Sequence, residues 1–146
     1  AERFEFPTEI PLETDLRELL EQQVGPKYFY DNRFGAFPEI QSKVVRTDTL
    51  YQWRRQYVRE NKSGVCPTLT ANMGSGGHNV PLVLDGKRIR KLTPRETARL
   101  QGFPDTFQLP KISDAHLYHQ FGNSVTVPLI ERIAKSFTIA LGGRKT

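Results

Sequence analysis

A helix start at residues 93–96 divides the chain into two parts of different character. Thr93-Pro94-Arg95-Glu96 has the form of a capping box. In such a box the threonine caps the helix, proline takes the first helical position and glutamate reaches back to the cap. Apolar residues come in short runs before this point and recur at helical spacing after it. The sequence therefore predicts a mainly β middle followed by a helical end.

The middle of the chain carries several short strand signals. Candidate strands are residues 43–46, 56–59, 68–70, 80–84 and 87–90. Asp85-Gly86 joins the last two, and this dipeptide favours a type I′ hairpin turn, which needs positive φ at both central residues. Pro81 lacks a backbone donor, which places the first strand of this hairpin at a sheet edge.

Weaker signals precede the strands. Thr14 and Asp15 can cap a short helix that bears leucines at positions 16, 19 and 20. Residues 25–42 mix glycine, proline, asparagine and aromatic residues without a clear period. We expect this stretch to be a loop that can contain one short helix.

Three helices are expected after the capping box. The first runs to Leu100 and stops at Gly102, and the second covers residues 114–121 and stops at Gly122. The third begins near Pro128. Its apolar stripe consists of Leu129, Ile130, Ile133, Ala134, Phe137 and Leu141. A stripe of this size on so short a chain predicts packing against a partner surface.

Charge is distributed unevenly along the chain. Residues 1–39 hold nine acids and four bases, whereas residues 40–146 hold seven acids and seventeen bases. A body this basic suits a polyanion such as nucleic acid, and a merely basic surface is the alternative. The mean hydropathy of -0.53, the absence of a long apolar run and the lack of a signal-peptide pattern predict a cytoplasmic protein without a membrane partner.

Residues 65–79 form the most unusual stretch. Thr68 and Thr70 fall on one side of an extended segment, and the glycines at 74, 76 and 77 let a backbone approach phosphates or base edges closely. A plain flexible loop is the alternative. A dinucleotide-binding fingerprint is disfavoured, because these glycines precede a strand instead of a helix.

A basic cluster with aromatic neighbours precedes this stretch. It comprises Arg54, Arg55, Arg59 and Lys62, with Trp53 and Tyr57 between them. Arginine can hold phosphate or guanine and aromatic rings can stack on bases, so the cluster is typical of nucleic-acid binding. The alternative is a solvated strand face with two core aromatics.

Three residues with reactive side chains favour plainer roles. Cys66 is the single cysteine, so it forms no internal disulfide, and it is better interpreted as a small packed residue than as a nucleophile. His116 and His119 share one helix face. A metal ion would need further ligands, and only Asp114 lies near, so no metal site is predicted.

Two stretches resemble motifs of the DNA (cytosine-5) methyltransferases. Residues 90–105 resemble motif IX, and residues 120–128, with Gln120-Phe121-Gly122-Asn123-Ser124-Val125, resemble motif X. Pro67-Thr68-Leu69-Thr70 with the glycine run resembles the end of the target recognition domain. Residues 4–7 and 15–20 resemble the stretch that follows motif VIII. The resemblance covers essentially the whole chain.

The resemblance implies an α/β enzyme with two domains. A Rossmann-like domain binds S-adenosylmethionine and holds the catalytic residues, and a small domain reads double-stranded DNA while the target cytosine is flipped out. Expected divisions of this chain are a segment following the catalytic domain (1–24), the target recognition domain (25–93), motif IX with hinge helices (94–122) and the motif X helix of the catalytic domain (123–146).

Site residues follow from the resemblance position by position. Thr68 is expected at a phosphate near the flipped base, with Thr70, Gly74, Gly76 and Gly77 also on the DNA side. Asn123, Ser124 and Val125 are expected to line the cofactor pocket, although without the resemblance Asn123 and Ser124 suggest helix caps. Arg54, Arg55 and Arg59 are assigned to DNA from their charge alone. Arg95 and Glu96 are expected to hold the domain together.

The departures from the family pattern shape the functional prediction. The Phe-x-Gly-x-Gly cofactor loop, the Pro-Cys motif of the nucleophile and the Glu-Asn-Val motif are all missing, and Cys66 precedes Pro67 instead of following a proline. We therefore expect no catalytic residue here and no methyl transfer without an N-terminal catalytic region or subunit. The setting predicted is bacterial restriction-modification. A free-standing DNA-binding module is the alternative, and an enzyme using Cys66 is a poorer third.

Overall fold

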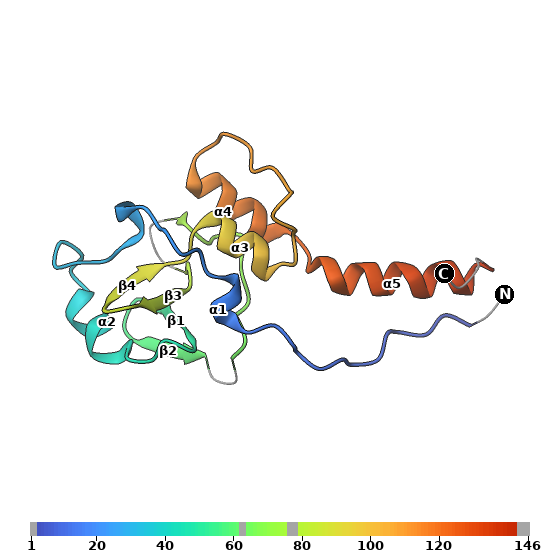
Figure 1. The fold of residues 1–146 in the computed structure, drawn as a ribbon, viewed down its shortest axis with the longest axis horizontal. Coiled ribbons are helices and arrows are strands. Elements are labelled where there is room, and N and C mark those ends of the chain that lie inside the picture. Colours follow the sequence, from blue (N-terminus) through green and yellow to red (C-terminus); the bar gives the residue numbers. More distant parts are fainter. Residues whose placement is uncertain (1–2, 62–63, 76–78, 143–146) are drawn as a thin grey trace.

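The computed structural model describes residues 3–61, 64–75 and 79–142, which form a body and an extension (Figure 1). The body is a mixed α/β unit around a four-stranded antiparallel sheet of order β2-β1-β3-β4. The strands are β1 (Leu50–Trp53), β2 (Val58–Asn61), β3 (Leu82–Asp85) and β4 (Arg88–Lys91). The helices are α1 (Leu16–Leu19), the 3-10 turn η1 (Pro26–Tyr28), α2 (Phe37–Lys43), α3 (Pro94–Leu100), α4 (Asp114–Asn123) and α5 (Val127–Ala140).

The hairpin predicted around residue 85 is confirmed, but its turn differs from the prediction. Asp85 pairs with Arg88, so the two loop residues are Gly86 and Lys87. Of these only Gly86 has positive φ, at +60°. A single positive φ at the first loop position is the pattern of a type II′ turn, which glycine allows without steric cost.

The remaining strand predictions are partly wrong. Residues 43–46 were expected to form a strand, yet Lys43 ends α2 and Val44 caps it with its side chain buried. The strand lies at Leu50–Trp53 instead. Residues 68–70 belong to no strand, and the backbone of Thr70 lies against Gly122 of helix α4 instead. The 56–59 prediction is confirmed with a shift, since β2 covers Val58–Asn61.

Pro81 does not mark a sheet edge. Strand β3 lies inside the sheet, between β1 and β4. Pro81 precedes the strand, so its missing donor interrupts no ladder bond, and its carbonyl accepts from the backbone N–H of Leu92. Proline is tolerated at a strand start for this reason.

The predicted helix starts are confirmed by their caps. Asp15 caps α1 by accepting from the backbone N–H of Arg17. Thr93 and Glu96 form the complete capping box of α3, which ends before Gly102 (φ +82°). Helix α4 does not stop at Gly122 as expected but continues to Asn123.

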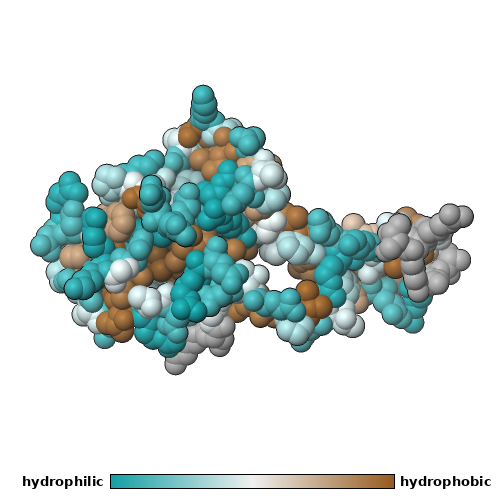
Figure 2. All heavy atoms as spheres, in the orientation of Figure 1, coloured by the Kyte–Doolittle hydropathy of each residue, from teal (hydrophilic) through white to brown (hydrophobic). Residues whose placement is uncertain are grey.

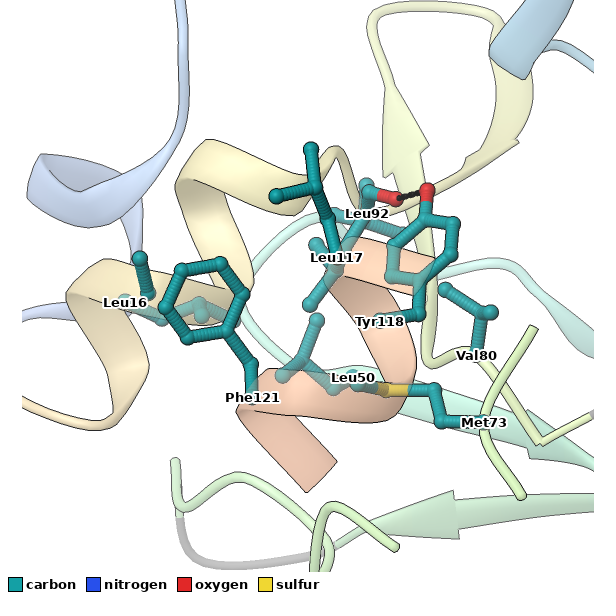
Figure 3. Close-up of a cluster of buried hydrophobic side chains, with 10 residues drawn as sticks. Leu16, Leu50, Met73, Val80, Leu92, Leu117, Tyr118 and Phe121 are labelled. Atoms are coloured by element: carbon teal, nitrogen blue, oxygen red, sulfur yellow. Dashed lines mark hydrogen bonds between the residues drawn. The ribbon is translucent and has the colours of Figure 1, made fainter. Parts of the chain in front are cut away.

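The main hydrophobic core joins distant parts of the chain (Figure 3). Its buried members include Leu16, Leu50, Met73, Val80, Leu92, Leu117, Tyr118 and Phe121. The Tyr118 hydroxyl donates to the Leu92 carbonyl at 2.6 Å, which satisfies a polar group within this core. The core therefore fixes helix α4 against both the sheet and the glycine-rich stretch.

A buried ion pair connects the β3–β4 hairpin to helix α3. The Arg90 guanidinium donates to both carboxylate oxygens of Glu96 at 2.8 Å, and both side chains are fully buried. Arg90 Nε also donates to Asp85 at 2.6 Å. Burial by itself lowers the pKa of Arg90, but the hydrogen bonds to Glu96 and Asp85 outweigh it and the pKa is raised. Arg90 therefore stays charged inside the body.

Glu96 also forms a hydrogen bond with the N-terminal segment at Glu21. Its carboxylate accepts from the backbone N–H groups of Thr93 at 2.7 Å and Glu21 at 2.8 Å. The Thr93 hydroxyl in turn donates to the Glu21 carboxylate at 2.5 Å. The expectation that Glu96 holds the domain together is confirmed, and Arg95 contributes one bond from its guanidinium to the Phe107 carbonyl.

Helix α5 leaves the body and forms the extension together with residues 3–12 (Figure 1). The Phe4 ring stacks on Phe137 with centroids 4.3 Å apart. Apolar residues lie among hydrophilic ones along this extension (Figure 2). The exposed apolar side chains of the extension are Phe6, Ile10, Leu12, Leu129, Ile130, Phe137 and Leu141. None of the helices in the described ranges is both long and apolar enough to cross a membrane.

Candidate functional site

A cavity of about 370 Å³ opens between strands β1 and β2 and the segment that follows them. Its lining residues are Gln52, Arg54, Arg59, Asn61, Val65, Cys66, Pro67, Thr68, Thr70, Asn72 and Asn79. Two of them are arginines and none is a carboxylate. We call it the basic cavity. Its positive and neutral polar lining suits an anionic ligand.

The basic cavity gathers four of the residues that the sequence assigned to DNA. Arg59 on β2 stands directly across the ladder from Gln52 on β1, and Arg54 lies in the turn that joins the two strands. Thr68 and Thr70 are exposed on the opposite wall, while Leu69 between them packs on the core. The alternation expected of a strand thus holds here without strand pairing.

Of the other four residues of that prediction, the structure places two elsewhere. Arg55 is in the β1–β2 turn with φ +66° and does not line the cavity. Gly74 has φ +82°, and a Cβ there would meet the Tyr118 ring at 2.7 Å, so packing alone requires glycine at this position. Gly76 and Gly77, like Lys62 of the basic cluster, lie outside the described residues.

The segment after Thr68 is fixed to helix α4. A Cβ at Gly122 would overlap the Thr70 carbonyl and approach the Ala71 nitrogen to 2.9 Å, so only glycine lets the two backbones meet. The His119 ring Nδ1 lies 2.5 Å from the Ala71 carbonyl. These contacts, together with buried Met73 (Figure 3), explain how an unpaired segment holds its shape.

A second cavity of about 400 Å³ adjoins the first and shares Cys66, Pro67 and Thr68 with it. We call it the apolar cavity. Its remaining lining residues are Leu69, Leu100, Gln101, Ser124, Val125, Thr126, Leu129 and Ile130. Of the residues assigned to the cofactor, Ser124 and Val125 lie here. Asn123 does not line the cavity, and its amide donates to the His119 ring at 3.1 Å.

The lining of the apolar cavity fits one side of S-adenosylmethionine. Its aliphatic side chains can cover the adenine, and the hydroxyls of Ser124 and Thr126 are hydrogen-bonding groups near it, although Ser124 already donates to the Phe121 carbonyl at 2.8 Å. No charged side chain is among the lining residues in the described part of the chain. This lining offers no charged group to the sulfonium or the amino acid of that cofactor.

Cys66 stands between the two cavities but is poorly suited to nucleophilic attack. Burial raises the pKa of its thiol to about 12, and the sulfur donates to the Pro67 carbonyl at 3.1 Å. An attacking cysteine needs the thiolate, which a lowered pKa provides. The surroundings of Cys66 do the opposite.

We expect native Cys66 to react with iodoacetamide at pH 8 at least tenfold more slowly than free cysteine, because so little thiolate is present at a raised pKa. Mass spectrometry of the alkylated protein over time gives the rate. The urea-unfolded chain is the control and should react at the rate of free cysteine. Equal rates for the folded and unfolded chain would show that the structure does not suppress the thiol.

The structure reveals polar residues of the basic cavity that sequence reasoning missed. Gln52 is 5% exposed and faces Arg59 across the ladder, and Asn61, Asn72 and Asn79 complete the wall. Gln52 could have been identified from its expected pairing with Arg59 in a β1–β2 hairpin. That signal was lost because strand β1 itself was not predicted.

The two helix histidines have ordinary polar partners. His116 Nδ1 lies 2.7 Å from the Ser113 hydroxyl, and His119 bridges Ala71 and Asn123. Within the ranges that the structure describes, no three His, Cys, Asp or Glu residues gather in a way that could hold a metal ion.

Comparison of the sequence with known proteins finds one family across nearly the whole chain. The profile of the C-5 cytosine-specific DNA methylases matches residues 2–138. The Type II methyltransferase M.Bsp6I of Bacillus sp. (strain RFL6) is 49% identical over 136 residues, which is 91% of this chain and 43% of that protein. M.NlaX of Neisseria lactamica is 36% identical over 152 residues, covering 94% of this chain and 43% of its own. The chain thus spans less than half the length of these relatives.

Solved structures show the same fold at low sequence identity. The Entamoeba histolytica methyltransferase EhMeth matches with a TM-score of 0.65 and 14% identity, over 96% of this chain and 46% of its own. The Dnmt2 methyltransferase of S. pombe matches with a TM-score of 0.63 and 17% identity, over 91% and 44% respectively. The arrangement of sheet and helices therefore also occurs in methyltransferase structures whose sequences are only distantly similar.

Proposed function

Because this chain belongs to the C-5 cytosine-specific DNA methylase family, we propose that it is the DNA-recognition part of a DNA (cytosine-5) methyltransferase. The complete enzyme transfers a methyl group from S-adenosylmethionine to C5 of a flipped cytosine in a specific duplex sequence, in the setting of bacterial restriction-modification. This chain supplies no catalytic residue and acts with an N-terminal catalytic region.

The observation that carries this proposal is the pair of adjoining cavities. The basic cavity holds Arg54, Arg59 and two threonines without a carboxylate, which suits a DNA backbone and base edges. The apolar cavity with Ser124 and Val125 suits one wall of a cofactor pocket. They share the wall formed by Cys66, Pro67 and Thr68, so DNA and cofactor would meet at that segment.

The exposed apolar stripe of helix α5 supports the proposal that a further region packs on this chain. Its apolar stripe is largely exposed: Phe137 is 52% and Leu141 is 83% exposed. Exposed apolar surface of this kind favours a protein partner, and the relatives are more than twice as long as this chain. We infer that residues 123–146 return to the Rossmann-like catalytic domain and that residues 1–24 are the segment that follows it. Residues 25–93 would then read DNA, and residues 94–122 would connect the two parts.

The chain's own groups have distinct tasks in this scheme. Arg54, Arg59 and Thr68 hold the duplex beside the flipped base, and the walls of the apolar cavity exclude water from the methyl donor. S-adenosylmethionine supplies the electrophilic methyl group when it is bound. The buried Arg90–Glu96 pair keeps the sheet that carries the arginines at a fixed angle to α3 and to the segment after it.

We expect methyl transfer only when the chain is combined with its N-terminal region. The assay mixes labelled S-adenosylmethionine with duplex DNA of varied sequence, using the chain alone, the N-terminal region alone and both together. Label in DNA only from the mixture is the expected result, since the cofactor loop and the Pro-Cys nucleophile are absent from this sequence.

Two other outcomes would each contradict the proposal. Methyl transfer by this chain alone would show that a catalytic group lies within it, and the Cys66→Ser variant would then identify or exclude that cysteine. A mixture that stays inactive on every duplex, although both parts are folded, would reject the role of the chain as part of a methyltransferase.

A further inference from the structure

One face of helix α4 holds residues 70–74, which we call the DNA-facing segment because of the proposed function. Tyr118 and Gly122 are four residues apart, and so are His119 and Asn123, so the four positions lie close together on the helix surface. Tyr118 packs against Gly74, and Gly122 receives the backbone of Thr70 and Ala71. Residues 70–74 therefore follow the surface of α4 closely.

His119 makes the polar contacts on this face. A carbonyl oxygen only accepts hydrogen bonds, so the Nδ1 that lies 2.5 Å from the Ala71 carbonyl must carry the proton. The Asn123 amide nitrogen only donates, so the Nε2 that lies 3.1 Å from it accepts. One imidazole thus joins the backbone of Ala71 to the side chain of Asn123.

The two groups that His119 joins belong to the two halves of the candidate site. Ala71 lies between Thr70 and Asn72, which both line the basic cavity. Asn123 ends helix α4 and precedes Ser124 and Val125, which line the apolar cavity. In the described part of the chain, no other side chain forms hydrogen bonds both to residues 70–72 and to residues 123–125.

We propose that His119 is a positioning residue. It holds the DNA-facing segment (residues 70–74) and the cofactor-side turn (residues 123–125) in fixed positions relative to each other. The inference rests on the proposed function, because it assigns DNA to one cavity and S-adenosylmethionine to the other. His119 touches neither ligand; it acts through Ala71 on one side and through Asn123 on the other.

Two substitutions separate these contacts within the complete methyltransferase. His119→Asn places an amide nitrogen where Nδ1 stands, so it keeps a donor for the Ala71 carbonyl and loses the acceptor for Asn123. His119→Gln places its amide near Nε2, so it keeps a partner for Asn123 and loses the bond to Ala71. His116→Asn and His116→Gln are matched controls on the same helix, because among the described residues the His116 side chain bonds only to Ser113.

The expected result is a split between the two Michaelis constants. His119→Gln raises the KM for DNA roughly three- to tenfold, the size of one lost hydrogen bond, and leaves the KM for S-adenosylmethionine unchanged. His119→Asn does the reverse. Both His116 variants behave as the unmodified enzyme. Equal changes in both constants for both His119 variants, or no change in either, would overturn the proposal.

Amide hydrogen exchange gives a second readout that does not depend on activity. The Met73 N–H donates to the Thr70 carbonyl at 2.9 Å and reports on the segment. His119→Gln should increase its exchange rate, whereas His119→Asn should not; equal rates in the two variants would contradict the inference. If the unmodified enzyme methylates no duplex, the proposed function fails, and this exchange comparison still decides whether His119 holds the segment.

Discussion

Glu96→Gln is expected to lower the free energy of unfolding by about 3 kcal/mol, because it removes the charge that neutralises a fully buried arginine. Arg90 would keep only Asp85 as an ionic partner, and Asp85 is partly exposed. The backbone N–H groups of Thr93 and Glu21 now donate to carboxylate oxygens. With a neutral amide in that place, these bonds weaken and one donor can face another. Urea unfolding followed by circular dichroism measures the change.

Asp31→Asn is the matched control for this prediction. Asp31 also pairs with an arginine, Arg33, at 2.7 Å, but the Arg33 side chain is 90% exposed. Solvent screens such pairs, so the control should leave the free energy of unfolding nearly unchanged. Similar effects of the two substitutions would mean that Arg90 and Glu96 are hydrated in solution, contrary to their burial in the structure.

Gly122→Ala is expected to destabilise the chain by about 2–3 kcal/mol, because the added methyl group has no space. The obstacle is the backbone of Thr70 and Ala71, which cannot rotate away as a side chain can. The sign of the change in the free energy of unfolding distinguishes this crowding from the usual effect of alanine in a helix. Alanine normally stabilises a helix interior relative to glycine by about 1 kcal/mol, and Gly122 lies within α4. Thermal unfolding and the exchange rate of the Met73 amide measure the effect.

Gln120→Ala in the same helix is the control for the glycine substitution. Gln120 is exposed, so alanine there should be neutral or slightly stabilising. If Gly122→Ala behaved like this control, residues 70–71 would not lie against α4 in solution. The positioning role of His119 would then lose its structural basis as well.

Features with local signals could be predicted from the sequence. The capping box at Thr93 and Glu96 and the hairpin around Gly86 depend on residues a few positions apart, and both are present. The turn type was missed because the register of the strands, which a dipeptide does not fix, decides which residues occupy the loop. The family resemblance implied an α/β fold with a mainly β small unit, and the body is a mixed α/β unit around an antiparallel sheet. Thr68 and Thr70 do line one cavity, but their role in binding DNA stays a prediction.

Features set by distant contacts could not be predicted. Strand β1 was not predicted, because Leu50, Tyr51 and Gln52 are all buried and the alternation typical of a surface strand is missing. Gly122 looked like a helix end because its actual partner, Thr70, lies far away in the sequence. Arg90 looked like an ordinary strand residue, because its burial against Glu96 of helix α3 has no local signal in the sequence.

The stacking of Phe4 on Phe137 brings the two ends of the fold to one place. The sheet and helices α1 to α4 lie between these two residues in the sequence and outside the extension that Phe4 and Phe137 share. A unit of this kind can lengthen, shorten or exchange its surface without moving the points at which it is attached. Under the proposed function, relatives could therefore differ around the basic cavity, and so in the DNA that they read, while the extension keeps the same contacts.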